Sequence, residues 1–251
     1  MKQYVVITGP FSTRSGYGEH ARDIFHSFYN LNKYEIELID VPWGNCPRSA
    51  LNSNNKKDKL ILDRILSKGL SKQPDIYVDV RIPNEFDTVG KFNIGITAGI
   101  ESNLVSPQWL EGINKMDLIL VPSQHSKDSF INSVWDKAQE TPQGPQKIGE
   151  IKCETQVEVL FEGADLDKWK PLDANDIPTD FYMLINNMVK EQFAFLFVGH
   201  WIKGGFGEDR KDIGRMVKVF YETFANLPEN KRPALILKTS GATQSILDRE
   251  E

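Results

Sequence analysis

The chain has 251 residues, 40% of them hydrophobic and 26% charged, which is enough for one large domain or two modest domains with a substantial core. Its formal net charge of -5 argues against a broad nucleic-acid-binding surface. The two cysteines, Cys46 and Cys153, lie far apart and lack metal-ligand spacing, which fits a reducing compartment. No apolar run approaches the roughly 20 residues of a membrane span, and the first residues enter a strand rather than a secretory signal, so we expect a cytoplasmic protein.

The first part of the chain alternates between predicted strands and helices. Residues 5–18 predict a strand that runs into a glycine-bearing loop, and residues 19–29 predict an amphipathic helix. Further strands are expected at 34–41, 75–81, 92–97, 117–122 and 157–161, and further helices around 60–70, after Ser106-Pro107 and after Ser123. The polar stretch 44–59 is expected to be a surface loop, and 137–155 is expected to be a loop or a local insertion rather than part of the sheet. This alternation predicts an α/β fold with a doubly wound parallel sheet.

From Phe193 the pattern restarts with a strand at 195–198, a glycine loop, a helix at 211–226 and a strand at 234–238. We therefore expect an N-terminal Rossmann-like domain at 1–175, a linker at 176–192 and the start of a second Rossmann-like domain at 193–251. A strand, glycine loop and helix in this order present backbone N–H groups and a helix N-terminus to an anion. Two such units predict two domains that face each other across a cleft.

Four segments, in this order, carry a family resemblance. They are residues 9–22; residues 95–101 followed by Pro107, Trp109 and residues 117–123; residues 157–165 with Trp169 and Pro171; and residues 197–201 leading to 210–213. Together they resemble retaining glycosyltransferases of the GT-B fold, a large family that includes many mannosyl- and glucosyltransferases. The resemblance covers most of the chain.

The chain departs from the family pattern in two places. His200 stands where the family commonly has arginine after a glycine. The family's C-terminal domain also continues beyond the point that corresponds to Glu251, and it carries there a pair of glutamates, one of them at the nucleotide ribose. The resemblance therefore implies a second domain that is incomplete, with much of the nucleotide-sugar pocket missing.

The resemblance implies a hexosyltransferase that moves a sugar from a nucleotide-sugar donor to a hydroxyl acceptor with retention of configuration and without a metal or other cofactor. Negative charge grows on the leaving phosphate in such a reaction, and fixed cations stabilise it. Arg210 and Lys211 have the required charge at the start of a predicted helix, where a purely structural role would oppose the helix dipole. Gly204 and Gly205 let the backbone approach the donor phosphate.

On the acceptor side, Glu101 and His20 are the expected catalytic residues. Glu101 follows a predicted strand and would orient an acceptor hydroxyl, whereas His20 lies in the first turn of the helix that opens at the glycine loop. The alternatives are a solvated loop glutamate and a helix-surface histidine. The loop residues expected to line the cleft are Arg14, Ser15, Gly16 and Gly18.

Two other functions stay open at this point. The chain would also fit a truncated, non-catalytic glycosyltransferase-like protein or subunit without a complete donor site, or an unrelated nucleotide-binding α/β protein such as a sugar epimerase. A NAD enzyme is disfavoured because the first loop lacks the Gly-x-Gly-x-x-Gly spacing. The expected partner is a nucleotide sugar and not nucleic acid. The sequence leaves open the sugar, the base, the oligomeric state, peripheral membrane contact and whether the acceptor is a glycan, a lipid-linked group or a protein.

Overall fold

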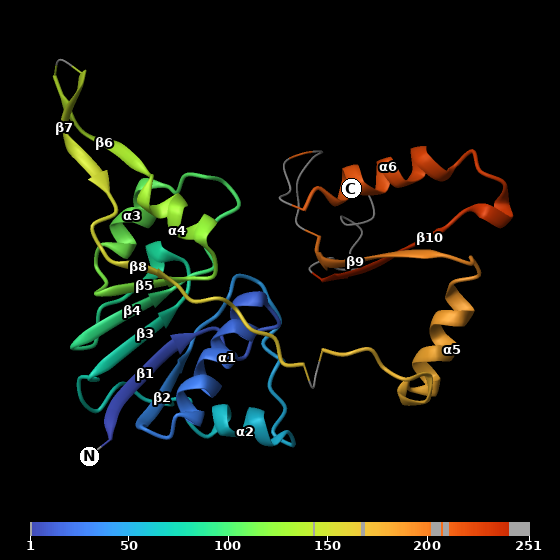
Figure 1. Ribbon diagram of the computed structural model, residues 1–251, viewed down its shortest axis with the longest axis horizontal. Coiled ribbons are helices and arrows are strands. Elements are labelled where there is room, and N and C mark those ends of the chain that lie inside the picture. The colour runs from blue at the N-terminus through green and yellow to red at the C-terminus, as the bar shows by residue number, and fades with distance from the viewer. Residues whose placement is uncertain (1, 143, 167–168, 202–206, 208–210, 241–251) are drawn as a thin grey trace. The chain divides into compact units, whose positions relative to one another are not determined.

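The computed structural model describes residues 2–142, 144–166, 169–201, 207 and 211–240 (Figure 1). The chain divides into two compact units, Met1–Gly163 and Ala164–Glu251. No helix in these described ranges is both long and apolar enough to cross a membrane.

The first unit is built on a six-stranded sheet with the order β2-β1-β3-β4-β5-β8. Every pair of neighbouring strands in it is parallel. The strands are β1 (Gln3–Gly9), β2 (Tyr34–Asp40), β3 (Ile76–Val80), β4 (Phe92–Ile96), β5 (Leu118–Val121) and β8 (Val157–Val159). The α/β class and the parallel sheet are thus confirmed, and each strand overlaps a predicted one.

Helices cover both faces of this sheet. Side chains alternate between the faces of a strand, and Val5, Ile7 and Val78 pack on one face with α1 (Gly16–Asn30) and α2 (Lys56–Leu62). Ile119 and Val121 point to the opposite face and pack with α3 (Pro107–Ile113) and α4 (Gln124–Ile131). The result is a Rossmann-like arrangement in which apolar strands are buried between two helical layers.

The helix starts follow the capping residues. Ser15 accepts a hydrogen bond from the N–H of Gly18, so α1 begins ahead of the apolar stripe that predicted it. Ser106 and Ser123 cap α3 and α4 as predicted. The helix expected around 60–70 is shifted, because Asn55 caps α2 at its start and Ile65 forms a β-bridge with Leu38 instead of a helical turn.

Of the two alternatives for the stretch 137–155, the loop was wrong and the local insertion outside the main sheet is confirmed. β6 (Val134–Thr141) and β7 (Gly144–Lys152) form an antiparallel hairpin with its own two-stranded sheet, outside the main sheet as expected. Gly144 has φ +104°, which is a conformation that favours glycine at the turn. At the base of the hairpin, the Trp135 indole donates to the carbonyl oxygen of Val105 over 2.8 Å.

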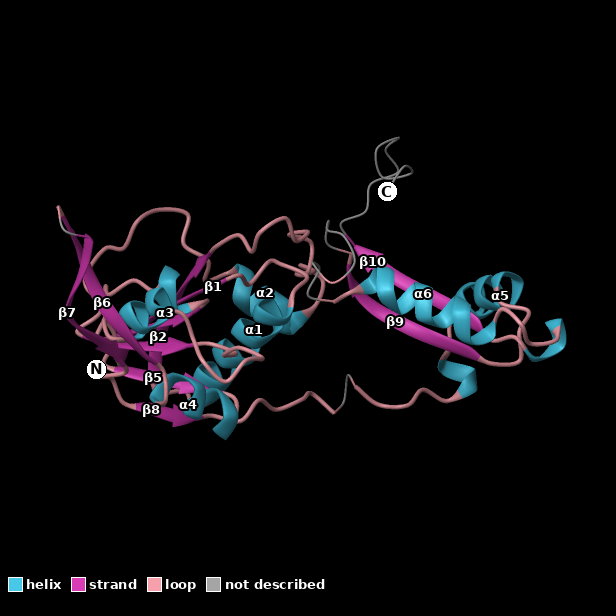
Figure 2. Ribbon diagram, turned by 90° about the horizontal axis from the view of Figure 1, so that it is seen from above, coloured by secondary structure: helices cyan, strands magenta, loops and turns pink. Residues whose placement is uncertain are grey.

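The described part of the second unit contains one β-α-β element. β9 (Ala194–His200) and β10 (Ala234–Ser240) are parallel, and α6 (Ile213–Phe224) connects them and lies along both strands (Figure 2). Phe195 packs against Phe220 and Phe224, with ring centroids 5.9 and 5.7 Å away. The range 176–192, expected as a linker, contains the helix α5 (Thr179–Met188).

Candidate functional site

The strand order creates a switch point between β1 and β3. The chain adds β2 on one side of β1 and then returns to place β3 on the other side. In open α/β sheets, ligands bind beyond the carboxyl ends of the strands at such a point. The segments that follow the strands at this edge are 10–15, 41–55, 81–91, 97–106, 122–123 and 160–163.

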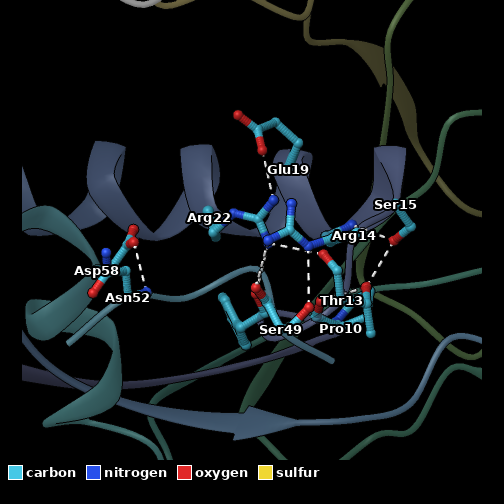
Figure 3. A network of polar contacts seen from close by, with 11 residues as sticks. Pro10, Thr13, Arg14, Ser15, Glu19, Arg22, Ser49, Asn52 and Asp58 are labelled. Carbon is cyan, nitrogen blue, oxygen red and sulfur yellow. Dashed lines mark hydrogen bonds and ion pairs between the residues drawn. The ribbon is translucent and has the colours of Figure 1, made fainter. Parts of the chain in front are cut away.

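Hydrogen bonds join the loop after β1 to the loop after β2. The backbone N–H of Ser12 donates to the Asp40 carboxylate over 3.0 Å, and Arg48 pairs with the same carboxylate at 2.7 Å. The Arg14 guanidinium donates to the hydroxyl and the carbonyl oxygen of Ser49 over 3.1 and 3.0 Å (Figure 3). Arg14 is exposed at the carboxyl edge of the sheet. Its guanidinium connects the loop after β1 to the loop after β2.

Ser15 and its neighbours form the turn into α1. The Ser15 hydroxyl accepts from the N–H of Gly18 over 3.0 Å and lies 2.7 Å from the Thr13 hydroxyl (Figure 3). Arg22, which the sequence analysis did not single out, donates to the carbonyl oxygens of Phe11 and Thr13 over 2.6 and 3.1 Å. These contacts fix the glycine loop from the helix side.

The two glycines of this turn have different surroundings. A Cβ atom on Gly16 would have no heavy atom within 4 Å, whereas one on Gly18 would lie 2.5 Å from the carbonyl oxygen of Thr13. Gly16 is exposed and Gly18 is buried. The need for glycine at position 18 is therefore steric, while position 16 has open space in front of it.

Gly18→Ala is expected to lower the free energy of unfolding by about 1–3 kcal/mol, because the loop must move to accommodate the new methyl group. Gly16→Ala is the matched control and should stay within about 0.5 kcal/mol of the wild type. Urea unfolding followed by circular dichroism measures both variants. Equal stability of the two variants would contradict the steric explanation.

A second group of side chains meets at the same edge, and we call it the Tyr17 cluster: Tyr17, His20, Trp43, Thr97 and Glu162. The Tyr17 hydroxyl lies 2.9 Å from the Thr97 hydroxyl and accepts from the N–H of Ala98 over 3.1 Å. Its ring stacks on Trp43 with the centroids 4.1 Å apart. Tyr17 thereby connects α1 to the loops that follow β2 and β4.

His20 occupies the next position on the same face of α1, because residues three apart on a helix are neighbours. Its Nδ1 lies 3.6 Å from Oε1 of Glu162, which follows β8. The His20 side chain is 14% exposed and that of Glu162 is 44% exposed. His20 is therefore a largely buried imidazole beside a solvent-accessible carboxylate.

Burial, hydrogen bonds and two carboxylates shape the electrostatic surroundings of Tyr17. Burial is the main cause that raises the pKa of its phenol, and the hydrogen bonds to Thr97 and Ala98 act in the opposite direction. The carboxylates of Glu162 and Glu85 raise this pKa further. Both carboxylates therefore lie within electrostatic reach of the Tyr17 hydroxyl.

Glu101 lies on the loop after β4, and it is exposed. This loop is held by α4, since the hydroxyls of Ser126 and Ser129 donate to the carbonyl oxygens of Ala98 and Ser102 over 3.3 and 3.1 Å. The same loop carries Thr97 and Ala98, which contact Tyr17. Glu101 and His20 therefore belong to segments that Tyr17 joins.

Of the residues expected at the donor phosphate, Gly204, Gly205 and Arg210 lie outside the described residues. Lys211 is described and exposed, and it precedes α6, which begins at Ile213 rather than at 211. Asp212 stands between them with φ +47° and pairs with Arg215 at 2.9 Å. Over the ranges that the structure describes, no three His, Cys, Asp or Glu side chains are grouped to hold a metal ion.

A cavity of about 730 Å³ lies at the opposite end of the strands. Its lining includes Lys2, Tyr29, Tyr34, Glu35 and Arg64, from the start of β1 and β2, the end of α1 and the segment after α2. The Arg64 guanidinium lies over the Tyr29 ring at 4.8 Å. We place the candidate site at the carboxyl edge instead, because the switch-point geometry and the polar cluster coincide there.

The sequence analysis did not identify Trp43 or Glu162 as site residues. Trp43 directly precedes the stretch expected to be a surface loop, and Glu162 was part of a motif without a role of its own.

No protein-family model matches the sequence, and no curated protein matches it significantly.

Proposed function

We propose that the chain is a glycosyltransferase that moves a sugar from a nucleotide-sugar donor to a hydroxyl acceptor with retention of configuration, and that its two units belong to a GT-B architecture. The resemblance of four ordered segments motivates this proposal. The observation that carries it furthest is the Tyr17 cluster, which brings His20 and Glu162 together at the carboxyl edge of a parallel sheet. Function at such a fold is decided by the site and not by the fold itself.

For retention, the acceptor oxygen bonds to the anomeric carbon on the face from which the diphosphate leaves, the bond from that carbon to the diphosphate breaks, and the acceptor hydroxyl loses its proton. His20 is the residue we assign to receive this proton, since a neutral imidazole is a general base. The Glu162 carboxylate, with Oε1 3.6 Å from Nδ1, would orient the imidazole ring. Glu101, on the neighbouring loop, would accept a hydrogen bond from an acceptor hydroxyl.

On the donor side, Arg210 and Lys211 would stabilise the leaving diphosphate. Charge that develops on a leaving group is stabilised best by cations that are already in place. Lys211 is exposed beside the start of α6, where a helix N-terminus adds positive potential. No metal is part of the proposed mechanism.

The second candidate function is a non-catalytic glycosyltransferase-like subunit without a complete donor site. One observation favours it. Within the described residues, the sheet of the second unit has two strands, and Leu196 and Val198 of β9 are 65% and 67% exposed. Parallel strands are normally buried on both faces, so the described part of this unit leaves apolar sheet surface open.

Titration calorimetry with UDP-, GDP- and ADP-sugars distinguishes the two candidates. The glycosyltransferase proposal predicts that one donor binds with a dissociation constant of about 1 mM or lower. The double variant Arg210→Ala/Lys211→Ala should weaken this binding at least about tenfold, because charge-assisted contacts to phosphate are lost. Lys218→Ala, an exposed cation on α6, is the control and should bind like the wild type. A folded chain that binds none of the donors would support the second candidate.

A further inference from the structure

The indole of Trp43 offers an aromatic surface at the candidate site. Its ring stacks on Tyr17 at 4.1 Å with 26° between the planes, and Trp43 is only half-buried. Part of the Trp43 side chain is therefore open to solvent while its ring stacks on Tyr17. An aromatic side chain held by a stack on one face is a rigid platform for a ligand on the other.

The charge around this platform selects the kind of ligand. The carboxylates of Glu162 and Glu85 lie within electrostatic reach of Tyr17. Arg14 is the arginine nearest to Tyr17 in the sequence, and its guanidinium donates hydrogen bonds to Ser49. Carboxylates accept hydrogen bonds from hydroxyl groups and repel phosphates. This combination suits a neutral ligand with many hydroxyls better than an anion.

A sugar ring has both required surfaces. Its C–H groups form an apolar face that packs on an aromatic ring, and its hydroxyls donate to carboxylates. A long lipid chain would need a larger apolar surface than one indole, and the cluster provides two polar partners instead, His20 and Glu162.

We propose that the Tyr17 cluster is a saccharide-binding subsite in which Trp43 stacks on the sugar ring and Glu162 accepts hydrogen bonds from its hydroxyls. The role of this saccharide as an acceptor rests on the proposed transferase function. Under that function, the acceptor is a sugar residue of a glycan. The saccharide site itself does not depend on that function.

Saturation-transfer-difference NMR on the full chain tests the subsite without any donor. The probes are methyl α-D-mannopyranoside, methyl α-D-glucopyranoside and methyl β-D-galactopyranoside, with inorganic phosphate as the competing anion. At least one glycoside should bind with a dissociation constant of about 1–10 mM, and phosphate should not displace it. Trp43→Ala should weaken binding at least about tenfold, because the stacking surface is lost.

Two further variants keep the test informative if Trp43→Ala fails to fold. Trp43→Phe keeps an aromatic ring on Tyr17, and Glu162→Gln keeps the shape of a side chain that is 44% exposed; each should weaken binding about threefold. Trp169→Ala, which removes an indole that is 63% exposed in the second unit, should bind like the wild type.

The outcomes separate this inference from the proposed function. Absence of binding of all three glycosides to the folded chain, or unchanged binding by both Trp43→Ala and Glu162→Gln, would overturn the saccharide subsite. If donors bind in calorimetry while no glycoside does, the subsite fails and the transferase proposal stands. If a glycoside binds as described and no donor does, the subsite stands as a carbohydrate-binding site and the transferase proposal fails.

Discussion

Replacement of Asp79 by alanine is expected to lower the free energy of unfolding of the first unit by about 3–5 kcal/mol, because it leaves a largely buried arginine without its main partner. The Asp79 side chain lies at the carboxyl end of β3 and is 0% exposed. It accepts from Nε and Nη2 of Arg81 over 2.7 and 2.6 Å and from the N–H of Asp87 over 3.0 Å. Burial raises the pKa of this carboxyl, although the hydrogen bonds from Arg81 and from the N–H of Asp87, together with the charge of Arg81, act in the opposite direction.

Urea unfolding measured by circular dichroism tests this expectation. Asp87→Ala is the matched control, since its carboxylate also pairs with Arg81, at 2.9 Å, but is 65% exposed. An ion pair with one exposed partner contributes little, so the control should lose about 1 kcal/mol or less. Similar losses of unfolding free energy in the two variants would show that burial of the Asp79–Arg81 pair does not determine how much the pair stabilises the first unit.

His20→Ala is expected to lower the rate of sugar transfer about 100-fold or more, since a positioned general base typically contributes a factor of that size. The measured quantity is the release of nucleoside diphosphate in the presence of donor and acceptor. His125→Ala, an exposed histidine on α4, is the control and should retain the wild-type rate. If His20→Ala transfers sugar at the wild-type rate, the imidazole is not the base, and Glu101 becomes the residue to test.

The sheet of the first unit was predictable because its signals are local. β1 and β3 carry apolar runs, and Ser106 and Ser123 each mark a helix start by capping it. The hairpin of β6 and β7 was missed because its strands are rich in charged and polar residues, which are depleted in typical strands. Its pairing is fixed by the turn at Gly144 and by contacts at its base.

The site was predictable only in part, because its contacts join elements that are far apart in the sequence. The glycine loop and His20 were identified from the first strand and helix, but their partners come from other loops. Trp43 reaches Tyr17 from the loop after β2, and Glu162 reaches His20 from the end of β8. These contacts follow from the strand order β2-β1-β3-β4-β5-β8, which a single sequence does not specify. The GT-B arrangement of the two units stays a prediction.

The most direct test of the central claim is transfer itself. The purified chain is incubated with UDP-, GDP- and ADP-sugars and the three methyl glycosides, and the products are followed by NMR of the anomeric protons. We predict release of one nucleoside diphosphate and a new glycosidic signal with the same anomeric configuration as the donor. Donors that stay intact in the presence of a folded chain that binds a glycoside would contradict the claim that this protein is a glycosyltransferase.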